Sequence, residues 1–146
     1  MENYQANHQH ELSSLPFNYS LQMGMYYNDV ISDGEKPYNV DRLRTFLHNV
    51  NNKMPDKLRI SIYETVGYPT LRILQYDGTD IIFTTREITR EGTHYITFYG
   101  DQLITRIAIN KNRKIQDFIL LTYDKKEIAV FHENMGIIYH NSRRRR

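Results

Sequence analysis

The sequence lacks cysteine and tryptophan altogether, and its 146 residues include only 7 glycines and 4 prolines. Without cysteine there is no disulfide, no thiolate nucleophile and no cysteine-ligated zinc or iron–sulfur site. No apolar run approaches the roughly 18 residues of a membrane helix, and the sequence begins without the pattern of a signal peptide. We expect a cytoplasmic protein without a membrane span, or an extracellular or membrane-anchored one if the natural chain starts further upstream.

Sequence motifs of catalysis are also missing. There is no Gly-x-Gly-x-x-Gly, no phosphate loop, no Gly-x-Ser-x-Gly elbow and no Ser-x-x-Lys pattern. His8 and His10 would hold a metal only with a third ligand, and His94, His132 and His140, on or beside expected strands, are a second weak candidate. We therefore expect no catalytic residue, no metal site, no cofactor and no enzymatic activity.

The positive charge is concentrated at the C-terminal end. The chain has 19 basic and 17 acidic residues, but Arg143–Arg146 supply four of the basic ones, so that 15 basic residues face 17 acidic ones elsewhere. Such a body is not the broadly basic surface of a dedicated nucleic-acid binder. The arginine run itself either binds phosphates or an acidic partner, or is a solvated tail.

The local pattern divides the chain into three parts: a flexible polar leader over residues 1–14, a single domain over residues 15–141 and a basic tail over residues 142–146. Alternating apolar residues from Leu15 to Val30 predict an extended segment that docks on the domain. Residues 40–50 then carry the apolar stripe of a helix, with Asn39 as its expected N-cap and Pro55 beyond its end.

Strand patterns dominate the remainder. Alternation and β-branched or aromatic residues predict strands over residues 57–63, 70–76, 80–85, 93–99, 102–109, 114–123 and 127–131, and residues 136–140 would add a last short one. Asp77-Gly78 is typical of a tight hairpin turn, and Gly100-Asp101 separates two of the strands. We expect an α+β domain in which one main helix packs on a strongly bent antiparallel β-sheet, or meander, of about seven strands.

The tyrosines are the most distinctive side chains, because there are twelve of them. Tyrosine is common at protein interfaces and can stack on sugars or bases, although it is also simply a good strand residue. The candidate binding residues are the tyrosines expected to point outward from strands and the terminal arginines: Tyr63, Tyr76, Tyr95, Tyr99, Arg143, Arg144, Arg145 and Arg146.

A specific order of residues runs from position 28 to position 85. It consists of Asn28-Asp29-Val30-Ile31, then Asn39, Leu43, Phe46 and Asn49-Val50, then Asp56-Lys57-Leu58-Arg59-Ile60, Tyr63-Glu64-Thr65, Pro69 and Leu74-Gln75-Tyr76-Asp77-Gly78. This order resembles the bacterial family called domain of unknown function 4362, and none of residues 86–146 takes part in the resemblance. The resemblance implies small lipoprotein-like proteins of Gram-positive spore formers; it implies no activity, and this chain lacks their lipid-bearing cysteine.

These observations favour a non-enzymatic binding module. We expect it to bind another protein through its sheet or an edge strand, as an inhibitor or immunity-type factor would. One alternative is anion or nucleic-acid binding by the arginine tail and the tyrosines. Another is a small-molecule binder at the mouth of the bent sheet, in a pocket lined by tyrosine and histidine. Since the resemblance involves positions that folding demands, we expect functional specificity outside residues 39–85.

Overall fold

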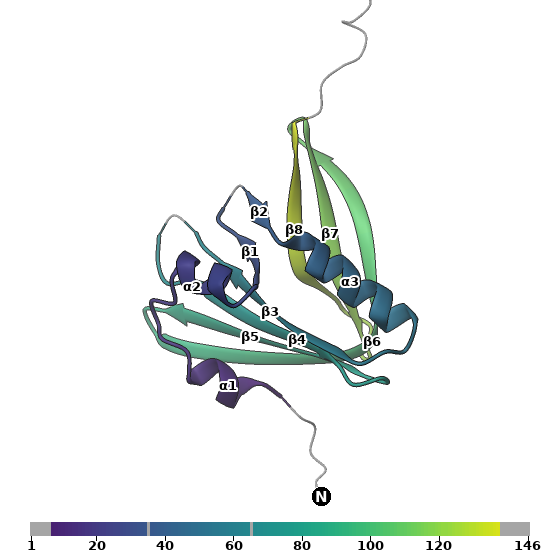
Figure 1. Cartoon of the computed structure of the whole chain (residues 1–146), viewed down its shortest axis with the longest axis horizontal. Helices are drawn as coiled ribbons and strands as arrows, with labels where there is room; N and C mark the ends of the chain where they lie inside the picture. Colours follow the sequence, from purple (N-terminus) through teal and green to yellow (C-terminus); the bar gives the residue numbers. More distant parts are fainter. Residues whose placement is uncertain (1–6, 35, 65, 138–146) are drawn as a thin grey trace, which may run out of the picture.

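The computed structural model describes residues 7–34, 36–64 and 66–137. Eight strands form one sheet in the order β2-β1-β3-β4-β5-β6-β7-β8, which bends into a nearly closed barrel (Figure 1). The strands are β1 (Val30–Ser32), β2 (Pro37–Tyr38), β3 (Asp56–Ile62), β4 (Thr70–Tyr76), β5 (Ile81–Thr89), β6 (Gly92–Asn110), β7 (Arg113–Thr122) and β8 (Glu127–Ile137). The helices are α1 (Gln9–Ser13), α2 (Leu21–Tyr26) and α3 (Val40–Asn51).

Short hairpins produce most of the strand order. In the turn between β4 and β5, the Asp77 carboxylate accepts hydrogen bonds from the backbone N–H groups of Thr79 (2.9 Å) and Asp80 (2.7 Å), and Gly78 has a φ of +99°. This is the turn chemistry that the Asp-Gly pair predicts. Neighbouring strands are antiparallel except β1 and β3, which run parallel because the chain crosses between them through α3.

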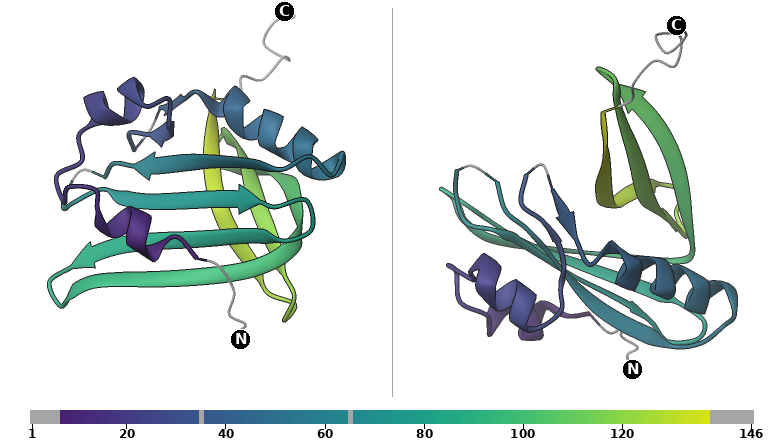
Figure 2. Two further views of the ribbon diagram at one scale, coloured as in Figure 1. Left: turned by 60° about the horizontal axis from the view of Figure 1, so that its bottom comes forward. Right: turned by 45° about the horizontal axis from the view of Figure 1, so that its top comes forward.

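The sheet bends within β6, the longest strand. The first part of β6 pairs with β5 and the second part with β7, and the register with β7 shifts between Gly100 and Gln102. A Cβ atom at residue 100 would lie 2.2 Å from the carbonyl oxygen of Leu121 on β7, far inside van der Waals contact. Glycine therefore permits the close approach of two backbones at the bend. Beyond it, β6, β7 and β8 stand away from the plane of β3, β4 and β5 (Figure 2).

The inner side of the bend encloses α3 and the main hydrophobic core. The apolar stripe of α3 is buried, with Leu43 and Phe46 both 0% exposed. It packs against core residues from both halves of the sheet, including Phe83 of β5, Phe118 of β7 and Phe131 of β8. At about 1.5–3 kcal/mol for each large apolar side chain, this burial is the main term holding the bent sheet around the helix.

A second, smaller core lies on the outer face of the sheet, beneath α1 and α2 (Figure 2). Leu12 of α1 and Tyr19 are buried there against Leu71 and Ile73 of β4. These contacts dock the N-terminal segment on the face that lies opposite α3.

Arg86 of β5 binds the backbone of the same N-terminal segment. Its side chain is fully buried, and its guanidinium donates hydrogen bonds to the backbone carbonyls of Leu12 (2.8 Å), Leu15 (2.8 Å) and Pro16 (3.0 Å). The ring of Phe17 lies 5.8 Å from the guanidinium carbon. Backbone carbonyls and an aromatic ring thus surround this cation. These contacts form only when residues 12–17 follow the backbone path seen here.

The expected fold class, an α+β domain with one main helix on a sheet of about seven strands, is wrong. Of the described residues, 53% are in strands and 18% in helices, and the sheet has eight strands in a nearly closed barrel. One cause is Gly100-Asp101, which lies inside the single strand β6 as an irregularity instead of separating two strands. The parallel pair of β1 and β3 also departs from the antiparallel meander.

The N-terminal predictions are corrected as well. Helix α1 and the buried Leu12 lie within residues 1–14, where the polar composition indicated a flexible leader. The alternating segment from Leu15 to Val30 contains helix α2, capped by the Ser20 hydroxyl, which accepts a hydrogen bond from the Met23 N–H at 3.1 Å. These short helices depend on tertiary docking, because helices of this length are unstable alone. The predicted basic tail lies outside the described residues.

Asn39 is not the side-chain cap that its position predicted. It is left-handed, with a φ of +62°, and makes no side-chain hydrogen bond to α3. Its amide instead donates to the carbonyl oxygens of Asn28 (2.9 Å) and Asp29 (3.3 Å). The side chain thereby ties the start of α3 to the segment that precedes β1.

Replacing Gly100 by alanine tests the bend. Since the new Cβ would meet the backbone of β7, the two strands would have to separate, and we expect Gly100→Ala to lower the free energy of unfolding by about 3 kcal/mol or more. Urea denaturation followed by circular dichroism measures the change. Asp101→Ala, at the exposed neighbouring position, is the control and should stay within about 0.5 kcal/mol of the original protein. Equal stabilities of the two variants would contradict the steric argument.

Candidate functional site

The four candidate tyrosines do not form one outward surface. Tyr76 is buried in the main core, only 3% exposed, and its hydroxyl donates to the carbonyl of Gly78 at 2.9 Å. Tyr63 and Tyr95 are half-buried against the second core, on the opposite face of the sheet. Tyr99 is half-buried elsewhere, beside a shallow cavity at the β7–β8 turn. An outward role for Tyr76 is therefore excluded by its burial, and the other three are divided between two places.

The histidines are likewise dispersed. His8 is buried, whereas His10, His94 and His132 are exposed on separate elements. Among the described residues, no three histidine, aspartate or glutamate side chains lie close enough to hold a metal ion. His140 and Arg143–Arg146 lie outside the described residues.

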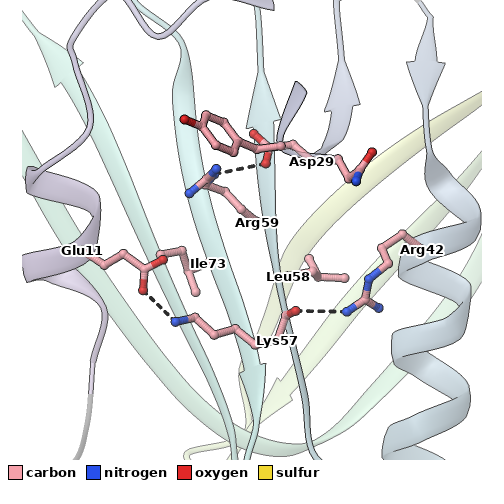
Figure 3. A pocket seen from close by; sticks show the side chains of 9 residues that line it. Glu11, Asp29, Arg42, Lys57, Leu58, Arg59 and Ile73 are labelled. Atoms are coloured by element: carbon pink, nitrogen blue, oxygen red, sulfur yellow. Dashed lines mark hydrogen bonds and ion pairs between the residues drawn. The ribbon is translucent and has the colours of Figure 1, made fainter. Parts of the chain in front are cut away.

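A polar cavity of about 290 Å³ lies between the N-terminal segment, β3 and α3 (Figure 3). Three cationic side chains and two carboxylates reach it from these elements. Its lining consists of Glu11, Tyr27, Asn28, Asp29, Arg42, Lys57, Leu58, Arg59 and Ile73.

The carboxylate of Asp29 is the centre of the hydrogen-bond network on one side of this cavity. Its side chain is 1% exposed. It accepts hydrogen bonds from the Tyr19 hydroxyl (2.7 Å), Arg59 Nε (3.1 Å) and the Ser61 hydroxyl (3.2 Å). Arg59 also donates to the Tyr19 hydroxyl at 3.0 Å, and its guanidinium stacks over the rings of Tyr19 and Tyr27. All three donors reach one buried carboxylate, which joins β3 to the segment before β1.

Burial dominates the titration behaviour of this network. It raises the pKa of Asp29 above its ordinary value, although hydrogen bonds from Tyr19, Arg59 and Ser61 oppose the shift. Burial, and then the hydrogen bond to Asp29, also raise the pKa of the Tyr19 phenol well above its usual range. The phenol consequently stays protonated at neutral pH and acts as a donor, not as a base.

The other two cations at the cavity are also paired. Arg42 of α3 forms two hydrogen bonds with Asp56 at the start of β3, at 2.9 and 2.5 Å, and Asn49 donates to the same carboxylate at 3.0 Å. Hydrogen bonds lower the pKa of Asp56, although its burial acts in the opposite direction. The ammonium of Lys57 lies 2.7 Å from Glu11 of α1.

The side chains around the polar cavity therefore form an ionic network, which joins α1, α3 and the segment before β1 to β3. Each of its three cations is held by a carboxylate, and the side chains that line the cavity include no serine, threonine or cysteine to serve as a nucleophile. Its geometry explains how the N-terminal segment and the crossover helix are held in place. A larger cavity lies elsewhere, at the gap in the barrel.

The barrel is open between β2 and β8, the two edge strands of the sheet. A groove of about 410 Å³ lies there, between the ends of β1 and β3 on one side and β7 and β8 on the other. Apolar and polar side chains alternate around it: Ser32, Gly34, Pro37, Ile62, Glu64, Ile115, Phe131, His132 and Asn134. No described strand pairs with the free side of β8.

The two edges differ in length and chemistry. β2 has two residues, one of which is Pro37, and a proline has no N–H with which to pair. β8 has eleven residues, and its inner face is partly covered by α3, where Arg44 lies 2.5 Å from Glu133. Short length, proline and β-bulges are among the usual protections of an edge strand. β2 is short and contains a proline, whereas β8 is long and has no proline, although its pairing with β7 contains two register irregularities.

The sequence pattern predicted the backbone around both features but not their roles. Alternation along β3 places Lys57, Arg59 and Ser61 opposite the main core, which predicted a solvent-facing surface. The outer face is instead covered by α1 and α2, so these polar side chains become an internal network. Asp29 was visible only as part of the family resemblance, and its three donors come from residues 10 to 32 positions away.

Fold and site together describe a mostly β protein with a nearly closed eight-stranded sheet, an ionic network that fastens its helices, and one long free edge. The chain matches the family described as Domain of unknown function (DUF4362) over residues 27–114, which is more than half of its length, and it belongs to that family. The match includes Asp29 with its donors Arg59 and Ser61, but not Tyr19 or Glu11, and it extends well beyond position 85, where the resemblance ended, into β7. β8 lies outside it.

No curated protein and no solved structure matches the chain. None of the helices that the structure describes combines the length and the apolar character of a membrane span.

Replacing Asp29 by asparagine tests the ionic network. The change keeps the size of the side chain but leaves the largely buried Arg59 without its carboxylate, and we expect the free energy of unfolding to fall by about 3 kcal/mol. Urea denaturation at pH 7 measures it. Glu127→Gln, which removes an exposed ion pair with Arg106, is the control and should change stability little. A small effect of Asp29→Asn would show that the network contributes nothing net.

The pH dependence of stability tests the docking of His8. Its side chain is 8% exposed, and burial and then Lys57 lower its pKa, against Glu11 and Gln75. Since the folded pKa lies below the unfolded value of about 6.5, the unfolded chain binds a proton first, and stability should fall as the pH decreases through 6.5. Urea midpoints between pH 7.5 and 5 measure this fall.

The control for that experiment compares the pH dependence of stability in two histidine variants. His8→Gln should flatten the acid-side slope of stability, whereas His94→Gln, at an exposed histidine of β6, is the matched substitution elsewhere. Identical slopes for His8→Gln and the original protein would mean that His8 does not couple protonation to folding.

Proposed function

We propose that this protein is a non-enzymatic binding module that accepts an extended segment of another protein at the free edge of β8. The observation that carries the proposal is the contrast between the two edges: eleven residues without proline at β8, and two residues with Pro37 at β2. An added strand would lie in the gap between them. It would pair with β8 and bring the barrel closer to closure.

Main-chain pairing supplies affinity in this mode of recognition, and alternating side chains supply specificity. In an antiparallel edge strand, every second residue directs its N–H and C=O away from its neighbour. Along β8 these groups adjoin a groove in which the partly exposed Ile62 and Ile115 offer apolar contacts, whereas Phe131 is buried in the main core. The same lining offers polar contacts from Ser32 and His132. The groove can therefore accommodate both kinds of side chain from an added strand.

The exposed apolar residues support the same surface. Met135 and Ile137 at the end of β8 are 44% and 54% exposed, and Ile107 and Ile109 on the β6–β7 hairpin are 48% and 68% exposed. They lie at the far end of the β6–β8 part of the sheet, where a partner that pairs with β8 would extend. A protein partner would bury this surface, as the target of an inhibitor or immunity-type factor does.

A small molecule in the groove is the second candidate function. A volume of about 410 Å³ lies within the usual range for ligand pockets. Among the described lining residues there is one histidine but no tyrosine, in contrast to the expected tyrosine-lined pocket. Anion or nucleic-acid binding has less support, because the candidate tyrosines are divided between separate places and the arginine run lies outside the described residues.

Proline substitutions in β8 test the strand-edge proposal. Adjacent residues of a strand point their N–H groups in opposite directions. One of the two variants His132→Pro and Glu133→Pro therefore loses a hydrogen bond to β7, which destabilises the fold. The other loses a hydrogen-bond donor at the free edge. The probe is a displayed library of random peptides of about twelve residues, selected on the original protein. We expect the folded proline variant to weaken binding of the selected peptides at least tenfold in fluorescence anisotropy.

Matched substitutions keep the N–H groups and isolate the side chains. Glu133→Gln, outside the groove lining, should bind the selected peptides within about threefold of the original protein. His132→Thr loses a polar contact of the groove but keeps the N–H, and should weaken binding less than removal of the edge donor by proline. Binding that survives both proline changes, or amide shift changes of bound peptide that map away from β8 and the groove, would refute edge pairing. A small molecule that binds the groove while the selected peptides remain bound at β8 would favour the second candidate.

A further inference from the structure

Arg72 of β4 is a cation inside the barrel that no carboxylate of the described residues pairs with. One terminal nitrogen donates to the carbonyl of Val130 on β8 at 2.8 Å, and the guanidinium carbon lies 5.8 Å from the ring of Phe83. The Nε atom is buried and has no hydrogen-bond partner. Burial lowers the pKa of Arg72, although an arginine still remains charged at neutral pH.

Arg86 is fully buried, whereas the side chain of Arg72 is only largely buried, and the Nε atoms of both arginines have no hydrogen-bond partner. The two differ in the contacts of their terminal nitrogens. The guanidinium of Arg86 donates to three backbone carbonyls, whereas that of Arg72 donates to one. The contacts of Arg86 account for its position, since they fasten the N-terminal segment. A largely buried cation with a single carbonyl acceptor and a buried, unpartnered Nε is costly, and a polar group left in this way calls for an explanation.

The position of Arg72 relative to the groove provides one. Its acceptor, Val130, directly precedes Phe131, a residue at the groove whose side chain is buried in the main core. Glu87 of β5 and then Glu64, another lining residue, lie close enough to stabilise the charge of Arg72 without forming an ion pair. The guanidinium thus crosses the interior from β4 to the strand with the free edge. A segment that pairs with β8 would direct every second side chain toward this interior.

We propose that Arg72 receives an acidic side chain of the segment that pairs with β8, so that the partner carries an aspartate or glutamate at an inward-facing position. The inference rests on the proposed edge pairing. A side-chain carboxylate fits better than a C-terminal one, because β8 continues on both sides of Val130, from Glu127 to Ile137. A strand along the whole edge therefore passes the guanidinium instead of ending there.

Such a contact would also give specificity. A charge-assisted hydrogen bond in a largely enclosed site is stronger than a neutral one, and arginine can bind a carboxylate through two parallel bonds. A partner with asparagine or glutamine at the same position would leave the cation with only the more distant carboxylates of Glu87 and Glu64, neither of which forms an ion pair with it. The groove would thereby reject neutral segments that pair with the edge equally well.

The test compares acidic and neutral peptides on two forms of the protein. Peptides that bind the β8 edge are each made with aspartate or glutamate and with the corresponding amide at the inward position. We expect the original protein to prefer the acidic form about tenfold or more, and Arg72→Met to reduce this preference to within about twofold, both measured by fluorescence anisotropy. Arg72→Lys, which keeps the positive charge but cannot form two parallel hydrogen bonds with a carboxylate, should retain part of the preference.

Stability separates this result from a folding defect. Because methionine replaces a largely buried cation that forms no ion pair with a described carboxylate, Arg72→Met should unfold at a temperature equal to or above that of the original protein. An undiminished acidic preference in Arg72→Met, or no preference in the original protein, would overturn the role of Arg72 while edge pairing stands. Loss of the preference on amidating the peptide C-terminus would overturn the side-chain assignment. Peptides that bind but ignore the proline changes in β8 would overturn both proposals.

Discussion

The close contact between Gly100 and the backbone of β7 is the constraint on which the rest of the structure depends. Because residue 100 has no Cβ, β6 can pass within contact of the Leu121 carbonyl and change partners from β5 to β7. The bend that results gives the sheet an inner and an outer side. The inner side can then enclose α3 together with the core side chains from both halves of the sheet. A flat sheet could not bury all of these side chains against one helix.

The bend also creates the gap in the barrel. A sheet curved this far brings its two edge strands toward each other without joining them, and the groove between β2 and β8 is the space that remains. One edge is blunted by Pro37 and by its length, and the other is long. Arg72 extends from the opposite wall to that long edge. The proposed partner strand and its acidic side chain both follow from this incomplete closure.

The outer face is organised by charge as well as by apolar contact. Asp29 gathers three donors, Arg86 gathers three carbonyls, and Lys57 pairs with Glu11 on α1. These contacts hold two very short helices that would not form in isolation. The sequence pattern on this face is polar because the face is covered by a polar network, which periodicity cannot distinguish from exposure to water.

The sequence by itself determined the local elements: α3 from its apolar stripe, the β4–β5 hairpin from Asp77-Gly78, and the family from the residues around Asp29 and Arg59. Those features depend on neighbours within a few positions. Only the tertiary structure decided that Gly100 bends one strand, that Tyr76 is buried, and that Arg72 reaches β8. Each of these results from contacts between residues distant in the chain, and side-chain periodicity carries no information about which distant surfaces meet.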